Sequence, residues 1–168
     1  AMATHARVLE QALVAAESAY FRGDWSEAST DLRAHALDTV ADSLEPQIDR
    51  MASLDAQTTG ITLYWARKMA ALAPLTFRLA AQALRDGVTR TECPGTYGPV
   101  EVLSQPLGPV ALIAPWNAPS TITAHKLASA LAAGCPVILK PSEHAPHTAG
   151  ILLRAIQESN VPKHTVQL

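Results

Sequence analysis

Two short runs of apolar residues, at 109–114 and 137–139, constrain what this 168-residue chain can fold into more than any other feature. Each run is uncharged and flanked by proline or glycine turns, which is typical of strands buried on both faces of a parallel sheet. The segment between them, at about 120–133, has the length of a helix and ends at Gly134. A second helix at 146–159 leads to a third strand candidate at 165–168. Because parallel neighbours need a crossover, residues 108–168 predict a β-α-β-α-β unit.

Residues 1–87 predict a layer of helices that covers such a sheet. Apolar residues follow the helical period in three expected helices, from Thr4 to Gly23, from Ser29 or Thr30 to Gly60, and from 61 to 85. Pro46 is expected to kink or restart the second helix, and Pro74 lies inside the third. Four aromatic residues on these stripes are expected in the core: Tyr20, Trp25, Tyr64 and Trp65.

The character of the sequence changes after Gly87. Prolines and glycines cluster at 93–109 and flank two β-like runs at 88–91 and 100–104, which predicts a hairpin or extended arm. The predicted fold class is α/β, in three regions. They are a helical N-terminal layer at 1–87, a β-arm at 88–107 and a partial, Rossmann-like β-α-β-α-β sheet at 108–168.

The composition excludes several classes of protein. An apolar fraction of 48% and a charged fraction of 17% are typical of a globular domain and not of a disordered chain. The net charge of −2 and the lack of a basic block argue against nucleic acid as a partner. No apolar run has the length of a membrane span, and two cysteines are too few for a disulfide scaffold. We therefore expect a cytoplasmic protein without a membrane partner.

Polar and aromatic side chains follow both predicted central strands. Trp116 and Asn117 come soon after the first, and Lys140 and Glu143 follow the second. Since the carboxyl ends of parallel neighbours meet at one edge, where open α/β sheets bind ligands, these residues are expected to lie together. A lysine and a glutamate at such an edge suit ribose hydroxyls, Trp116 offers a flat apolar wall, and Asn117 offers an amide donor. On spacing alone, an exposed loop pair without a ligand remains an equal alternative.

The same segments resemble the aldehyde dehydrogenase superfamily. The stretches PLGPVALIAPWNAP at 106–119 and ALAAGCPVILKPSE at 130–143 are similar to signature segments of that family. Residues 161–168 are similar to the family's next strand, the helices after Trp25 to its helical entrance, and 88–105 to its oligomerisation arm. The resemblance covers essentially the whole chain, but only the N-terminal part of the family's own length.

The resemblance implies roles for individual residues. Asn117 matches an amide of the family's oxyanion hole, and Lys126 matches a lysine behind the active site. Lys140 and Glu143, with Ser142 between them, match the segment that grips the adenosine ribose of the cofactor. The wall of the cofactor cleft is expected to consist of Ile113, Ala114, Pro115 and Trp116. The implied cofactor is NAD or NADP, with NAD favoured because a carboxylate prefers a free 2′-hydroxyl, and no metal site is expected.

The chain also departs from the family's pattern. Ala118 and Ala145 stand where the family usually has a bulky residue and a hydroxyl-bearing helix cap. In the family, the glycine-rich turn for the cofactor pyrophosphate, the general-base glutamate and the nucleophilic cysteine come after the position of Leu168. Neither Cys93 nor Cys135 aligns with that nucleophile. These 168 residues alone are therefore expected to bind the dinucleotide weakly or not at all and to oxidise no aldehyde.

Three interpretations of the function are open at this point. The first is the NAD(P)-binding N-terminal portion of an aldehyde dehydrogenase-like oxidoreductase with a small-molecule substrate. The second is a truncated relative that acts as a non-redox assembly or binding subunit. The third is a cofactor-independent enzyme on a biosynthetic intermediate, using Asn117 with His125 or Lys126. Open strand edges and the arm predict a homo-oligomer or a complementary chain as partner.

Overall fold

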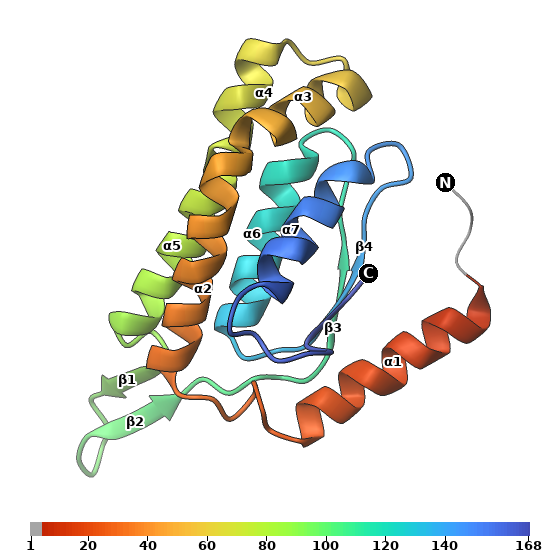
Figure 1. Cartoon of the computed structure of the whole chain (residues 1–168). Coiled ribbons are helices and arrows are strands. Elements are labelled where there is room, and N and C mark those ends of the chain that lie inside the picture. The colour runs from red at the N-terminus through yellow and green to blue at the C-terminus, as the bar shows by residue number, and fades with distance from the viewer. Residues whose placement is uncertain (1–4) are drawn as a thin grey trace.

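Helices alternate with short strands in the C-terminal part of the chain, as expected for an α/β fold (Figure 1). The computed structural model describes residues 5–168, so the expected helix cap at Thr4 lies outside the described residues. The helices are α1 (Ala6–Phe21), α2 (Thr30–Leu44), the 3₁₀ turn η1 (Glu45–Gln47), α3 (Ile48–Thr59), α4 (Leu63–Ala70), α5 (Leu72–Arg85), α6 (Pro119–Ala132) and α7 (His147–Gln157). The strands are β1 (Arg90–Cys93), β2 (Val100–Leu103), β3 (Val110–Ile113), β4 (Val137–Lys140) and β5 (Val166–Gln167).

The strands β3, β4 and β5 form one parallel sheet in that order. Val110 lies opposite Val137, and Val137 lies opposite Val166. The helix α6 connects β3 to β4, and α7 connects β4 to β5. The predicted β-α-β-α-β arrangement is therefore confirmed.

Helices lie on both sides of this sheet (Figure 1). On one side, α6 packs against β3 and β4, and α2 and α5 pack behind α6. On the other side, α1 contacts β4 and β5. The helix α3 contacts both α6 and α7 at the end where these two helices begin, so it lies near the carboxyl edge of the sheet.

The expectation that β3 is buried on both faces is wrong. Leu112 is buried, whereas Ala111 is exposed and Ile113 is 67% exposed. The reason is that α1 contacts β4 and β5 and leaves one face of β3 uncovered. The neighbouring strand is better covered on this face, since Ile138 on β4, which lies opposite Ala111, is partly buried. On the other face, Val137 and Leu139 are almost completely buried.

Trp25 joins the turn after α1 to the helices that cover the sheet. Its side chain is fully buried, and its indole N–H donates to the backbone carbonyl of Leu131 on α6 at 3.0 Å. The same core contains the fully buried side chains of Leu37 on α2, Phe77 on α5 and Leu127 on α6. The core position predicted for Trp25 is confirmed.

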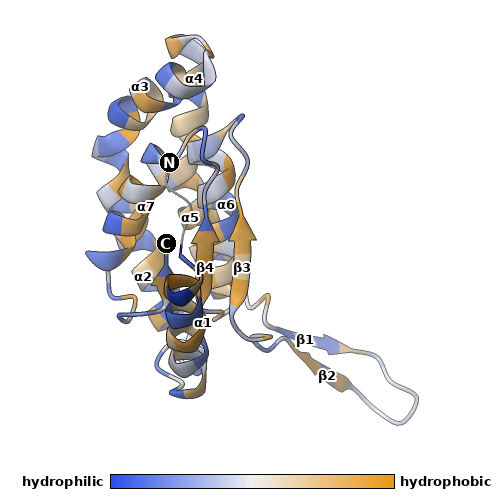
Figure 2. Ribbon diagram, turned by 90° about the vertical axis from the view of Figure 1, so that its right-hand side faces the viewer, coloured by the Kyte–Doolittle hydropathy of each residue, from blue (hydrophilic) through white to orange (hydrophobic). Residues whose placement is uncertain are grey.

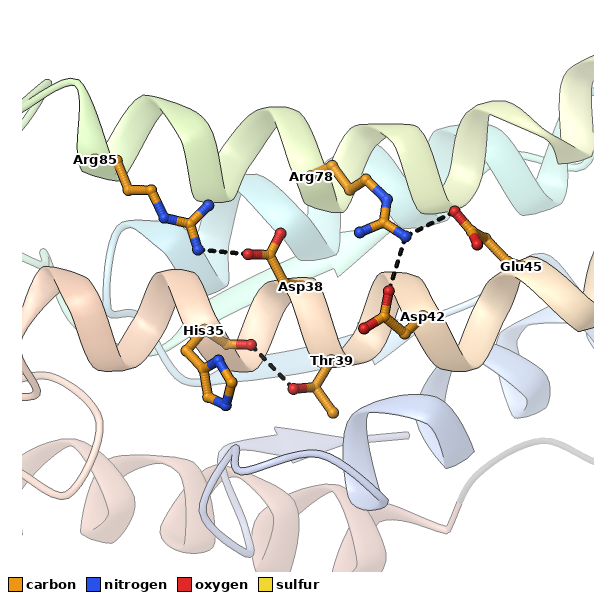
Figure 3. Close-up of polar contacts among 7 residues, drawn as sticks. All are labelled: His35, Asp38, Thr39, Asp42, Glu45, Arg78 and Arg85. Atoms are coloured by element: carbon orange, nitrogen blue, oxygen red, sulfur yellow. Dashed lines mark hydrogen bonds and ion pairs between the residues drawn. The ribbon is translucent and has the colours of Figure 1, made fainter.

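Ion pairs connect α2 and η1 to α5 along an exposed seam (Figure 3). Arg78 lies 2.7 Å from Glu45 and 2.8 Å from Asp42, and Arg85 pairs with Asp38. Hydrogen bonds from Arg78, first to Glu45 and then to Asp42, raise the pKa of its guanidinium. Exposed pairs contribute about 0–1 kcal/mol each, so the apolar contact between the two helices is the larger stabilising effect.

Several helix boundaries follow directly from local residue chemistry. Ser29 begins α2, since its hydroxyl oxygen accepts a hydrogen bond from the backbone N–H of Leu32 at 3.2 Å. Pro46 lies in η1, where the chain restarts as α3. Gly60 ends α3 in the left-handed conformation with φ of 76°, which favours glycine. These predicted boundaries are confirmed.

The single helix expected at 61–85 is wrong, because the chain forms two helices that meet at Ala71. Pro74 lies in the first turn of α5. A proline has no backbone N–H to donate, and its ring clashes with the preceding turn of a continuous helix. The break therefore falls just before the proline, where its missing N–H costs least.

The side of α4 that is buried differs from the side that the sequence predicted. Ala66 and Ala70 are buried where α4 packs against α3. Tyr64 and Trp65 are 66% and 58% exposed, so the core position expected for them is wrong. The physical reason is that the buried face of α4 carries Ala66 and Ala70, which continue in helical register into Ala73 and Phe77 on α5. The two aromatic residues lie outside this stripe.

The β-arm is an antiparallel hairpin that projects from the rest of the chain (Figure 2). Arg90 on β1 pairs with Glu101 on β2. All four residues of β2 are exposed, and Tyr97 in the connecting turn is also fully exposed. The hairpin predicted from the sequence is confirmed, and it places apolar side chains on an open surface.

Candidate functional site

The loops that follow β3 and β4 lie at the same end of the sheet (Figure 1). Ile113 lies opposite Lys140 in the parallel register. The backbone N–H of Ala114 donates to the carbonyl of Lys140 at 3.0 Å, so the two strands separate only after these residues. The predicted shared edge is confirmed.

Lys140 and Glu143 form an ion pair at this edge. The Nζ atom of Lys140 lies 3.3 Å from Oε2 of Glu143, and the two side chains remain 64% and 61% exposed. The backbone N–H of Glu143 itself, and then the Lys140 ammonium, lower the pKa of the Glu143 carboxyl. The edge therefore presents an accessible carboxylate acceptor next to an accessible cationic donor.

The Glu143 carboxyl is expected to titrate below the ordinary range of glutamate. Because its pKa is lowered by folding, the interaction is complete above the unfolded-state pKa and is lost as the pH falls through the folded-state value. Lys140→Ala is expected to raise this pKa only partway, since the backbone hydrogen bond of Glu143 is the larger cause and stays in place. NMR of the Glu143 carboxyl carbon against pH measures both values. Lys163→Ala is the control, and an unchanged titration in Lys140→Ala contradicts the ion pair.

The loop from β3 to α6 adds an apolar surface and an amide. Ile113 and Trp116 are 67% and 51% exposed, Pro115 is half-buried, and Asn117 is exposed. Ala114, also expected in the cleft wall, is 4% exposed and belongs to the core beneath the loop. The other wall residues therefore form an open surface beside the ion pair.

The helix α6 begins directly after Asn117 without a local side-chain cap. Its N-cap residue is Ala118, which has φ of −149° and makes no side-chain hydrogen bond, and Pro119 is the first helical residue. The N-terminus of a helix carries a partial positive charge from its free backbone N–H groups. An amide side chain next to a helix N-terminus is an arrangement that favours a developing negative charge on oxygen.

Asp55 on α3 supplies the hydrogen bonds that Ala118 does not make. Its side chain is 3% exposed. One carboxylate oxygen accepts from the backbone N–H of Ser120 at 3.3 Å and from its hydroxyl at 2.5 Å. The other oxygen accepts from the hydroxyl of Thr148 on α7 at 2.6 Å. Sequence analysis missed Asp55, although a carboxylate on the same helical face as the apolar Met51 is the available signal.

Two expected site residues lie deeper than the edge. Ser142 is 7% exposed, and its hydroxyl oxygen accepts from the backbone N–H of His144 at 3.2 Å, so it shapes the loop from inside. Lys126 is half-buried on α6. At 1.5 Å per residue it lies roughly 10 Å along the helix axis from Pro119, behind the edge rather than on it.

The described residues, 5–168, contain no cluster of three or more potential metal ligands. His144 and His147 therefore have no third ligand of this kind, and Pro146 separates them. Within the same range no helix is both long and apolar enough to cross a membrane. A hollow of about 330 Å³ between α3 and α7 is lined by residues such as Arg50, His147 and Arg154, and none of the expected cofactor-binding residues lines it.

Known enzymes are similar in sequence to this chain. The 3-succinoylsemialdehyde-pyridine dehydrogenase of Pseudomonas sp is 39% identical over 140 residues, which cover 82% of this chain and 28% of that protein. The NADP/NAD-dependent aldehyde dehydrogenase PuuC of Escherichia coli is 33% identical over 155 residues, which cover 92% of this chain and 31% of that protein. The chain thus spans about a third of the length of these curated relatives.

Solved structures share its fold. The NAD-dependent aldehyde dehydrogenase from Sinorhizobium meliloti matches 97% of this chain and 33% of its own, with a TM-score of 0.88 and 27% identity. The betaine aldehyde dehydrogenase of Staphylococcus aureus, in complex with NAD+, matches 94% of this chain and 31% of its own, with a TM-score of 0.84 and 28% identity. The aldehyde dehydrogenase family also matches the sequence across residues 1–168. A family match along the whole sequence, together with the fold that carries both strand-tip loops, shows that this chain belongs to the aldehyde dehydrogenase family.

Proposed function

We propose that residues 1–168 form the part of an NAD(P)-dependent aldehyde dehydrogenase that holds the cofactor's adenosine ribose and donates a hydrogen bond to the aldehyde oxygen. The overall reaction is the oxidation of a small aldehyde to a carboxylic acid. The observation that carries the proposal is the shared edge of β3 and β4, where the Lys140–Glu143 pair lies next to the loop of Trp116 and Asn117.

The side chains at this edge fit a dinucleotide. The vicinal hydroxyls of a ribose both donate and accept hydrogen bonds, and the carboxylate of Glu143 and the ammonium of Lys140 provide the two complementary functions. The exposed faces of Trp116 and Ile113 suit an apolar ring surface. A structural relative, the Staphylococcus aureus betaine aldehyde dehydrogenase, has been solved with NAD+. When bound, this cofactor supplies the chemistry of a hydride acceptor.

In this proposal, each residue of the edge has a separate task. Asn117 donates its amide N–H to the aldehyde oxygen, which gains negative charge during the reaction, and the N-terminus of α6 adds favourable partial charge. Lys140 and Glu143 bind the ribose, and Trp116 excludes water from one side of the cofactor. Lys126 places a positive charge along α6 behind the oxygen. No residue within 1–168 is assigned the role of nucleophile or general base.

NAD is expected to bind the 168-residue chain weakly and at this edge only. Titration with millimolar NAD is expected to shift the NMR signals of the Trp116 indole and of the amides at 140–143. Lys140→Ala is expected to weaken the affinity about tenfold, because it removes a charge-assisted hydrogen bond. NADP is expected to bind more weakly than NAD, since its 2′-phosphate meets the charged carboxylate of Glu143.

The matched control for this titration is Lys163→Ala, which removes an exposed lysine away from the edge. Signal shifts spread over the whole chain, or an affinity that is the same in Lys140→Ala and the unsubstituted chain, contradict the proposed site. Because weak or absent binding is expected of these residues alone, the titration is repeated in a chimaera in which residues 1–168 replace the matching segment of a longer relative. An NAD affinity that is the same in Lys140→Ala and the unsubstituted chimaera contradicts the proposed site and favours the alternative of a non-redox assembly subunit.

We also infer that the chain self-associates through the β-arm. Val100, Val102 and Leu103 on β2 are 52%, 51% and 55% exposed, and Tyr97 at the tip is fully exposed. A two-stranded hairpin is marginally stable by itself and gains stability when its apolar side chains are covered by a second copy. Light scattering coupled to gel filtration is expected to give a mass above the 17.8 kDa of one chain. Val102→Lys with Leu103→Lys is expected to return it to that of one chain, and a monomer before substitution contradicts the inference.

A further inference from the structure

The two helices that follow the candidate edge both begin without a side-chain N-cap. The N-cap residue of α6 is Ala118 and that of α7 is Pro146, and neither makes a side-chain hydrogen bond. Helix N-termini leave several backbone N–H groups without partners, and a side chain at the N-cap normally satisfies one of them. At α6 a group from elsewhere in the chain takes this place, since Asp55 accepts from the backbone N–H of Ser120. At α7 the same carboxylate accepts from the hydroxyl of Thr148.

We propose that Asp55 is a positioning residue that holds the loops 116–119 and 141–146 in fixed register across the cofactor edge. This proposal rests on the proposed function, since the relative position of these loops affects chemistry only if the edge binds cofactor and substrate. Asp55 lies on a third element, α3. One of its carboxylate oxygens accepts hydrogen bonds from α6 and the other accepts one from α7. One side chain thus connects the start of α6, next to Asn117, to the start of α7, next to Glu143.

Burial makes this connection specific. Asp55, Ser120 and Thr148 are 3%, 0% and 2% exposed, so water does not replace a lost partner. An ionised carboxylate only accepts hydrogen bonds, and here it meets three donors, the Ser120 N–H and the hydroxyls of Ser120 and Thr148. A negative charge beside two helix N-termini is also electrostatically favourable. Among the described residues, the donors to the Asp55 carboxylate lie on α6 and α7, and only its backbone carbonyl accepts from its own helix, from Thr59 at 2.7 Å. The carboxylate therefore links elements, whereas the backbone of Asp55 belongs to α3.

Hydrogen–deuterium exchange of the full 168-residue chain tests this without any cofactor. Asp55→Ala is expected to speed amide exchange about tenfold in both 116–122 and 142–150, the change expected when hydrogen bonds to a charged group are lost. Ser120→Ala is expected to speed exchange in the first segment only, and Thr148→Val in the second only. These single variants decide the question even if Asp55→Ala does not fold.

Asp55→Asn provides a rescue test. Its amide oxygen accepts from Ser120 and its NH₂ group donates to the Thr148 hydroxyl, so it keeps the geometry without the charge. We expect exchange rates in both loops much closer to those of the unsubstituted chain than in Asp55→Ala. The matched control is Ser53→Ala, which removes a hydroxyl that bonds only within α3.

Unchanged exchange in both loops of Asp55→Ala overturns the inference. So does an equal acceleration along the whole chain in Ser120→Ala and Thr148→Val, which indicates general destabilisation instead of loop positioning. The NAD titration is a separate measurement. If Lys140→Ala leaves the NAD affinity unchanged while the exchange pattern holds, the proposed function fails and Asp55 still positions the loops.

Discussion

Replacing Asn117 with alanine is expected to lower kcat for aldehyde oxidation by about 10²–10³, the effect of losing one donor from an oxyanion hole. The measurement needs a protein with the remaining catalytic groups. A chimaera in which residues 1–168 replace the matching segment of the Bacillus subtilis betaine aldehyde dehydrogenase supplies them. That relative is 30% identical over 159 residues, which cover 94% of this chain. The donor acts as negative charge develops, so kcat and kcat/KM are expected to fall together.

The reference for this comparison is the unsubstituted chimaera. Asn160→Ala is the matched control, because Asn160 is an exposed asparagine on the loop between α7 and β5, away from the edge that carries Asn117. It is expected to leave kcat unchanged. A kcat of Asn117→Ala within about twofold of the unsubstituted chimaera corresponds to a change in barrier height of less than about 0.5 kcal/mol. Such a result contradicts the proposed role of Asn117 in the oxyanion hole.

Trp25→Ala is expected to lower the free energy of unfolding of the 168-residue chain by about 3–5 kcal/mol, the usual cost of removing a large aromatic side chain from a core. Trp25 is fully buried, and its indole N–H bond to Leu131 is lost as well. A marginally stable domain has a total free energy of unfolding of about 5–15 kcal/mol, so the loss is a large share of the total at the lower end of this range. Urea denaturation followed by circular dichroism measures the change.

Two controls separate burial from hydrogen bonding at this site. Trp25→Phe keeps most of the apolar volume and loses the indole N–H, so it is expected to cost about 1–2 kcal/mol. Trp65→Ala removes a 58% exposed tryptophan and is expected to cost less than either core variant. A loss below 1 kcal/mol in Trp25→Ala contradicts its role as the link between the α1–α2 turn and α6.

Local chemistry in the sequence determined the elements and the shared edge of the candidate site. Uncharged apolar runs form β3 and β4, and Ser29 and Gly60 mark the start of α2 and the end of α3. Parallel pairing through a crossover helix is sufficient to place Trp116 and Lys140 at one end of the sheet. These features depend on backbone conformation and side-chain period, which act over a few neighbouring residues. They can therefore be predicted from the sequence before any tertiary contact is known.

Tertiary packing alone decided which surfaces meet. Asp55 bonds to residues 65 and 93 positions away, a relation that no local pattern contains. The same holds for Trp65, which follows the helical period and is nevertheless exposed because α4 packs through the face that carries Ala66 and Ala70. Ile113 is exposed because α1 contacts β4 and β5 rather than β3. Burial is a property of two facing surfaces, whereas a single sequence segment specifies only one of them.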